Sequence, residues 1–180
     1  MIELFGVSML KKFDNSFIDK FYSRQIKIPE VGKTGQLKLL NCALCLSTND
    51  NISEFLTFLC ASIGFGKIFV KNPDEYAELK LRNPFLNVEK FDNIRDSSRL
   101  YIVGKSDIKI SNRTNVFYIN FRKKADLITV AFSKEFEFWD FEEEDIITQR
   151  MIACILAAEV TKHIVNDEKE KIIDIEFKEV

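Results

Sequence analysis

The feature that most constrains this chain is a change in hydrophobic period at Gly66. Before it, apolar residues recur at helical spacing; after it, short β-branched and aromatic runs alternate with Asn, Asp, Gly, Pro and Ser. These runs cover residues 67–70, 76–81, 85–91, 99–103, 107–111, 115–122 and 126–132. The pattern predicts a meandering antiparallel sheet, with the last two runs as its clearest hairpin.

Two helices are predicted ahead of this region. Residues 36–47 carry apolar side chains on more than one face, which predicts a helix buried on two sides. Residues 51–63 carry one apolar stripe behind a capping box of Asn51 and Glu54. Gly64 or Gly66 supplies the left-handed residue that ends this second helix.

The longest predicted helix follows the sheet region and covers residues 142–166. Asp140 can cap it, and its middle, residues 151–158, is apolar all round. Such a helix must be covered on both sides, by the sheet and by a partner helix. The tail that follows, residues 171–180, has the alternation of a strand, and this strand is expected to pair only with a partner chain.

This reading predicts an α+β fold: an antiparallel sheet of about six strands with helices packed on one face. Residues 1–35 form an N-terminal helical leader and connector, interrupted by Pro29 and Gly32. Residues 36–166 form the main domain. Residues 167–180 form a C-terminal tail.

The charge and the cysteine content narrow the class of protein. Twenty-six basic residues against 28 acidic ones leave a net charge of -2, which argues against nucleic acid as a partner. No apolar run approaches the roughly 20 residues that span a bilayer, and no basic segment precedes the apolar N-terminus, so neither membrane insertion nor export is expected. Four cysteines in apolar contexts are expected to be reduced and buried, in a cytoplasmic protein.

The order of elements resembles that of a GAF domain, and a related PAS or roadblock-like α+β fold is the alternative. The resemblance covers residues 36–165 and is most specific between Ala125 and His163. There, Phe141-Glu142-Glu143-Glu144-Asp145 resembles the family's helix start, and residues 151–159 resemble its Ala-rich helix. Ile146 stands where the cyclic-nucleotide-binding members carry Glu, so no cyclic nucleotide is expected.

The resemblance implies a standalone GAF-like regulatory domain that is not an enzyme. It would act in signalling as a homodimer or as a scaffold subunit docked on another protein, through its helical face. The interface predicted for it combines positions at a/d-like spacing with one aromatic from the stretch before the last helix. Its members are Leu37, Leu40, Leu44, Ile147, Met151, Cys154, Ala158 and Trp139.

Two alternatives stay open. A small-molecule sensor would use a pocket between the sheet and the polar loop 92–99, with Arg95 and Arg99 contacting an anionic ligand. An enzyme would use the Cys42 and Cys45 pair as a reactive thiol.

No cofactor, metal ligand set or catalytic residue is assigned. The Gly-Lys-Thr at residues 32–34 lacks the upstream glycine of a phosphate loop. The only histidine, His163, is expected at the exposed end of the last helix.

A charge placed in the predicted interface tests it. Ala158→Glu should convert a dimer into monomers, because a carboxylate cannot be buried without a partner. Light scattering on the purified chain measures the mass, and an unchanged oligomeric mass would contradict the interface.

Overall fold

The computed structural model describes residues 15–48, 50–91, 99–104, 115–124, 127–135, 137–140 and 145–176. Its helices are α2 (Asn15–Phe21), α3 (Ser23–Ile26), α4 (Gly32–Leu40), α5 (Asn51–Ile63), η1 (Pro73–Tyr76), α6 (Leu79–Arg82) and α7 (Ile146–Val165). Its strands are β1 (Cys42–Leu46), β2 (Lys67–Val70), β3 (Asn87–Lys90), β4 (Arg99–Val103), β5 (Val116–Lys124), β6 (Leu127–Ser133), β7 (Trp139–Asp140) and β8 (Lys171–Glu176).

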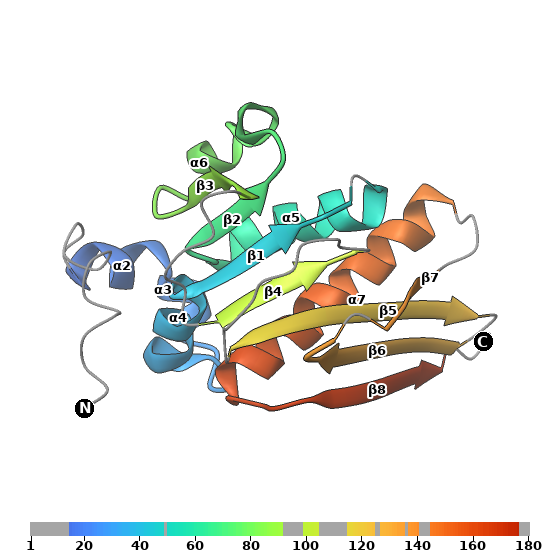
Figure 1. Cartoon of the computed structure of the whole chain (residues 1–180). Helices are drawn as coiled ribbons and strands as arrows, with labels where there is room; N and C mark the ends of the chain where they lie inside the picture. The colour runs from blue at the N-terminus through green and yellow to red at the C-terminus, as the bar shows by residue number, and fades with distance from the viewer. Residues whose placement is uncertain are drawn as a thin grey trace.

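The described strands form one mixed sheet, whose main path runs β3-β2-β1-β4-β5-β6-β8 (Figure 1). The first five strands on this path are parallel to one another. Helix α5 carries the chain from β1 to β2, as a crossover between parallel strands requires. The order 3-2-1-4-5 around a central β1 is that of Rossmann-like sheets, and it places a topological switch point between β1 and β4.

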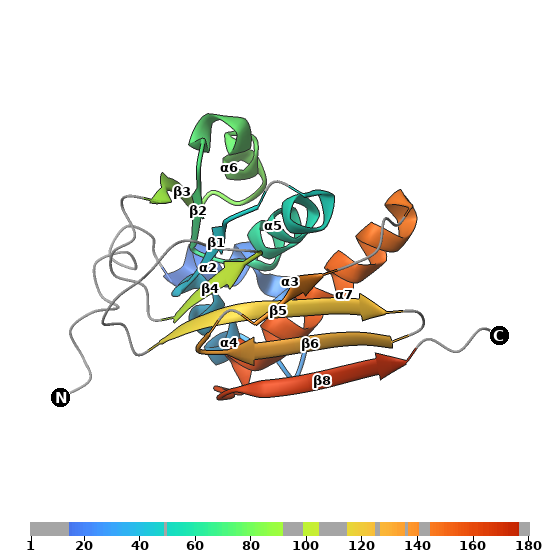
Figure 2. The same cartoon turned by 45° about the vertical axis from the view of Figure 1, so that its right-hand side comes forward.

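The other edge of the sheet is antiparallel. β6 pairs antiparallel with both β5 and β8, and the three strands lie side by side (Figure 2). The short strand β7 pairs with β5 off the main path. The tail strand β8 therefore pairs within its own chain.

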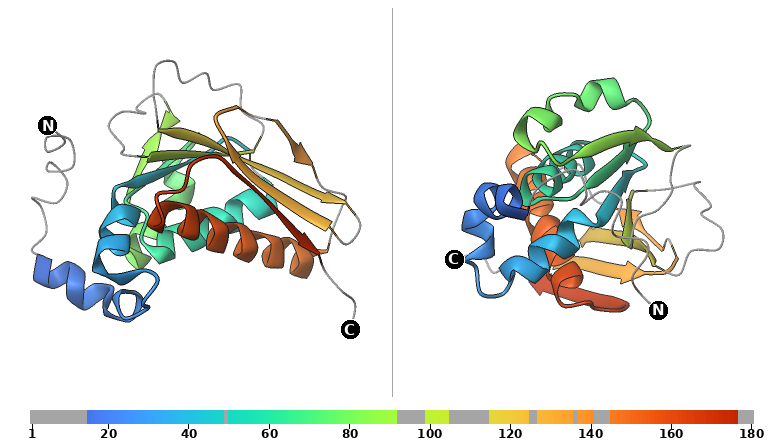
Figure 3. Two further views of the ribbon diagram at one scale, coloured as in Figure 1. Left: turned by 90° about the horizontal axis from the view of Figure 1, so that it is seen from below. Right: turned by 90° about the vertical axis from the view of Figure 1, so that its left-hand side faces the viewer.

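The main core lies between the sheet and the helices α4, α5 and α7, which pack on the same face (Figure 3). A smaller apolar cluster lies on the opposite face and includes Ala43, Cys45 and Ile102. The leader packs through a third cluster, which contains Ile18, Tyr22 and Phe85 and in which the rings of Tyr22 and Phe85 contact each other. None of the described helices combines the length and apolar character that crossing a bilayer demands.

Several predicted elements are confirmed. α5 spans residues 51–63 as predicted, and Gly64 ends it with a φ of 115°. β2, β4 and the hairpin of β5 and β6 also lie where the period-two pattern placed them. The predicted strand at 107–111 falls outside the described residues.

Other predicted elements are wrong. The predicted helix 36–47 is the second half of α4 followed by strand β1, and the predicted strand 76–81 is helical. The helix caps differ too: Asp50 caps α5 in place of Asn51, and Asp145 caps α7 in place of Asp140.

The predicted fold class is wrong for the same reason. All five residues of β1 are buried, since parallel strands are covered on both faces and read as continuous apolar runs. Such a run cannot be distinguished from a buried helix by its period. Without β1 as a strand, the strands after Gly66 read as an antiparallel meander.

The contact between α4 and the start of β2 makes a stability prediction. A Cβ on Gly66 would lie 1.8 Å from the backbone oxygen of Leu40, so Gly66→Ala should lower the free energy of unfolding by about 3 kcal/mol. Gly32 has a φ of +57° and no atom within 4 Å of its Cβ position, so Gly32→Ala should cost only the left-handed strain of about 1 kcal/mol. Urea denaturation of the two variants measures both values. Equal losses would contradict the close approach.

Candidate functional site

Rossmann-like sheets bind ligands at the carboxyl ends of the strands, where the switch point opens a crevice. In this chain that place lies where β1 and β4 end. The amide and hydroxyl of Ser47, just after β1, both donate to the carbonyl oxygen of Val103 at the end of β4, at 3.1 and 2.6 Å. The turn after β1 is thus tied directly to β4.

Asp50 organises the rest of this turn as the N-cap of α5. One carboxylate oxygen accepts the backbone N–H of Ser53 at 2.8 Å. The other accepts the hydroxyls of Thr48 and Ser53 at 2.7 and 2.9 Å, and the indole N–H of Trp139 at 3.1 Å. We call these four residues the Asp50 network.

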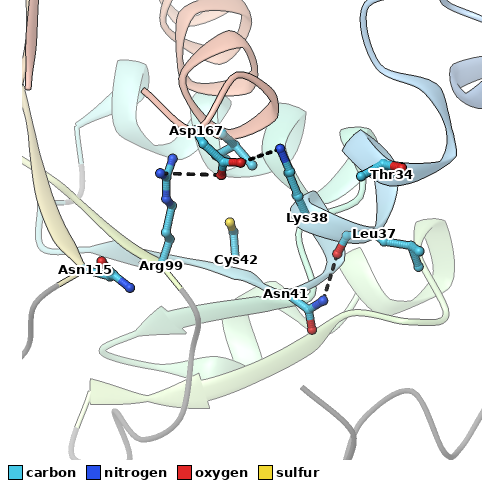
Figure 4. Close-up of a pocket in the computed structure, with 9 residues that line it drawn as sticks. Thr34, Leu37, Lys38, Asn41, Cys42, Arg99, Asn115 and Asp167 are labelled. Carbon is cyan, nitrogen blue, oxygen red and sulfur yellow. Dashed lines mark hydrogen bonds and ion pairs between the residues drawn. The ribbon is translucent and has the colours of Figure 1, made fainter. Parts of the chain in front are cut away.

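A pocket of about 470 Å³ lies at the opposite edge of the sheet, where β1, β4 and β5 begin (Figure 4). We call it the basal pocket. It is open to solvent and is lined by α4, by the start of these strands and by the end of α7. Its lining residues are Thr34, Leu37, Lys38, Asn41, Cys42, Arg99, Asn115, Ile164 and Asp167.

The end of α7 forms one wall of the basal pocket. The amides of Asp167 and Glu168 donate to the carbonyl oxygens of Ile164 and His163, the crossed pair of bonds that defines a Schellman motif. Asp167 takes the left-handed position of this motif, with a φ of 53°. Aspartate tolerates that conformation better than most residues do, since its short polar side chain can hydrogen-bond locally.

Two cations converge on Asp167 (Figure 4). Lys38 donates to its carboxylate at 2.6 Å and to the carbonyl oxygen of Val165 at 2.7 Å. Arg99 donates to the carbonyl oxygen of His163 at 2.9 Å and lies 3.6 Å from the Asp167 carboxylate. Basic side chains at a helix C-terminus bind its last carbonyls and oppose its dipole, so these contacts also stabilise the end of α7.

His163 lies fully buried behind Arg99, where the sequence had predicted an exposed residue. Its Nε2 faces the carbonyl oxygen of Lys169, which can only accept, so Nε2 carries the proton. Nδ1 is then the acceptor for the Tyr101 hydroxyl at 2.8 Å. Burial lowers the pKa of His163, and the neutral imidazole is held between Tyr101 of β4 and the carbonyl oxygen of Lys169, which lies between α7 and β8.

The cysteines do not form a reactive pair. Cys42 and Cys45 lie three residues apart on a strand, so their side chains point to opposite faces and belong to different apolar clusters. Burial raises the pKa of Cys45 to about 12, which keeps that thiol protonated. All four cysteines are free, as expected, but Cys154 is exposed. Among the described residues no cluster of His, Cys, Asp and Glu could hold a metal ion.

The predicted ligand contacts and interface fall in different places. Arg99 lines the basal pocket, whereas Arg95 lies outside the described residues. Leu44 is in the core on β1, Leu40 is buried, and Leu37 lines the basal pocket.

The α7 members of the predicted interface share the exposed face of that helix: Ile147, Met151, Cys154 and Ala158. Trp139 is half-buried in the Asp50 network. The interface itself stays a prediction.

Sequence reasoning missed Lys38 and Asp167. The Asn-Asp pair at residues 166–167 carries a signal, because both residue types accept the left-handed position that ends a helix. Lys38 carries none, since a lysine on a short helix is ordinary and its partner lies 129 residues away.

No protein-family model and no curated protein matches the sequence. Solved structures do match. A crystal structure of E. coli MccB has a TM-score of 0.56 at 15% identity, over 91% of this chain and 71% of that one. PaaA has a TM-score of 0.59 at 12% identity, over 93% and 72%. MccB with ATP has a TM-score of 0.55 at 18% identity, over 82% and 63%. At these identities the likeness shows the fold.

The likeness overturns the GAF interpretation. Two proteins whose structures share this fold are MccB, described as a microcin C7 biosynthetic enzyme, and PaaA. The predictions of a GAF domain, of a non-enzymatic regulatory scaffold in signalling, and of a GAF-like sensor are therefore wrong. The sheet is a Rossmann-like mixed sheet, and the fold is one that enzymes use.

Acidification should weaken this fold through His163, the only histidine. Because burial holds its pKa below the ordinary 6.5, the unfolded chain binds a proton at a higher pH than the folded chain does. The free energy of unfolding should therefore fall as the pH drops below about 6.5 towards the folded pKa. Urea denaturation at a series of pH values measures the fall. His163→Gln, which keeps hydrogen-bonding groups but does not titrate, should show a shallower dependence; equal slopes would contradict the assignment.

Proposed function

We propose that this chain acts in a biosynthetic enzyme and binds a carboxylate-bearing substrate in the basal pocket. The single observation that carries the proposal is the convergence of Lys38 and Arg99 on the Asp167 carboxylate in the pocket wall. The pocket already binds one carboxylate, which belongs to the chain itself. A substrate carboxylate would meet the same two cations.

The geometry supports an exchange of carboxylates. Asp167 is 63% exposed, and its 3.6 Å distance from Arg99 is longer than a hydrogen bond. A guanidinium carries five N–H donors in a fork that matches a carboxylate; the carbonyl oxygen of His163 takes one donor nitrogen, and the Tyr101 hydroxyl also interacts with Arg99. Arg99 therefore has the capacity to hold a second carboxylate.

The rest of the pocket suits an organic acid. Leu37 and Ile164 supply apolar surface, while Thr34, Asn41 and Asn115 supply hydroxyl and amide groups. A volume of about 470 Å³ lies within the usual range of small-molecule sites. The likeness of the fold to MccB, a microcin C7 biosynthetic enzyme crystallised with N-formylated MccA, supports the proposed biosynthetic role.

A carboxylate probe tests the proposal. A short acetylated peptide with a free C-terminal carboxylate, and succinate, should each raise the melting temperature saturably, whereas the C-terminal amide of the same peptide should not. A response to the peptide acid alone would identify a peptide end as the substrate group. No response to either acid would overturn the proposal.

Two variants should change the affinity of the probe in opposite directions. Arg99→Gln should lower the affinity for the probe by about tenfold or more, because it removes a charge-assisted hydrogen bond. Asp167→Asn should bind several times more tightly, because it removes the internal carboxylate and keeps a side chain that tolerates the left-handed position. Isothermal titration measures both. General damage to the fold would instead lower both affinities.

Arg82→Gln is the matched control. Arg82 also lies over a phenylalanine ring, at 4.2 Å from the centroid of Phe58, as Arg99 lies over Phe117 at 5.6 Å. It does not line the basal pocket. Its loss should leave the affinity of the probe unchanged, and an effect as large as that of Arg99→Gln would contradict the assigned role of Arg99.

A further inference from the structure

We infer that the residues described at the carboxyl ends of β1 and β4, where the topological switch point lies, do not bind a nucleotide, so an ATP-dependent step in which this chain takes part needs a nucleotide site elsewhere. The inference does not depend on the basal pocket. The fold itself accommodates nucleotides, since MccB has been crystallised with ATP and with AMPCPP. The question is whether the residues at the carboxyl ends of β1 and β4 fit one.

The turn after β1 lacks the residues that cradle phosphates. Rossmann-like dinucleotide sites use a glycine-rich turn at this position, so that the backbone can approach the pyrophosphate. Here the turn reads Ser47-Thr48-Asn49-Asp50, with no glycine. The same sites carry an acidic residue near the end of the second strand for the ribose, whereas Lys71 follows β2.

The Asp50 carboxylate occupies the helix N-terminus that would otherwise attract phosphate. Helix N-termini bind anions through unpaired backbone N–H groups and the positive end of the dipole. In α5 the amide of Ser53 already donates to Asp50, at 2.8 Å. A phosphate arriving there would meet a fixed negative charge in place of a donor.

The turn after β1 also packs tightly on the end of β4. A Cβ on Gly104 would lie 2.4 Å from side-chain atoms of Thr48, so the glycine lets these two segments touch each other. Gly104 has a φ of +81°, which favours glycine independently. Trp139 of β7 adds a further contact through its bond to Asp50. The backbone at the end of β4 is therefore approached by a side chain of the turn after β1, which occupies the place that a nucleotide would need.

Trp139 makes the inference measurable, because it is the only tryptophan in the chain and belongs to the Asp50 network. Mg-ATP and AMPCPP at millimolar concentrations should leave the fluorescence emission of the full chain unchanged. A saturable change in emission would overturn the inference. A rise in melting temperature with unchanged emission would support it, because the nucleotide would then bind away from the crevice.

Paired cap variants verify the reporter. Asp50→Ala should lower the melting temperature and shift the emission of Trp139 to longer wavelength, since it removes a cap and the indole partner. Asp145→Ala removes the corresponding cap of α7, which accepts the amides of Ile147 and Thr148. It should lower the melting temperature without moving the emission. If the emission of Asp50→Ala is identical to that of the unaltered chain, the contact between Asp50 and Trp139 is contradicted, and the inference that rests on this network is overturned.

The nucleotide test and the carboxylate test fail independently. Binding of ATP at the crevice would leave the response of the basal pocket to acids in place. A basal pocket that does not respond to acids would leave the expected result of the nucleotide test, an unchanged emission of Trp139, as it is. Each result therefore contradicts only one of the two proposals, the one for the switch point or the one for the basal pocket.

Discussion

The structure depends on β1 being hydrogen-bonded on both sides in the middle of the sheet. It pairs in parallel with β2 and with β4, and every one of its five residues is buried. A central parallel strand needs a crossover connection to its neighbour, which α5 supplies. Its two neighbours must also begin at the same edge of the sheet as it does, and end at the same edge. Both sites follow from this constraint, because the Asp50 network lies where β1 ends and the basal pocket lies where it begins.

Local signals were sufficient for about half of the elements. The stripe and glycine terminator of α5, and the alternation of the β5–β6 hairpin, depend on residues close in sequence and were predicted correctly. The parallel pairings join residues that are far apart, such as Ala43 with Leu100, and no turn residue announces them. The five residues of β1 are all apolar, so they show neither a helical nor a period-two pattern. The strand that determines the topology therefore cannot be identified from the hydrophobic pattern.

The candidate site was predictable only in part, for a similar reason. Arg99 follows a polar stretch of the sequence, which predicts that it contacts an anionic ligand. Its partner Asp167 follows the end of α7 and binds Lys38 of α4 as well, so the chain has to fold before Lys38, Arg99 and Asp167 meet. His163 shows the opposite error: a histidine near a helix end usually faces solvent, but here side chains of β4, β5 and β6 and the carbonyl oxygen of Lys169 cover it.

Two aspartates at helix ends explain why the two edges of the sheet differ. Asp50 lies at the N-terminus of α5, where the backbone amide and the dipole both favour a carboxylate, so a competing anion gains nothing by replacing it. Asp167 lies at the C-terminus of α7, where the dipole disfavours negative charge and the backbone is left-handed. It is held there by Lys38 and Arg99 alone among the contacts described for its side chain. The carboxylate that we propose a ligand replaces is therefore the one at the basal edge, opposite the edge where sheets of this order usually bind their ligands.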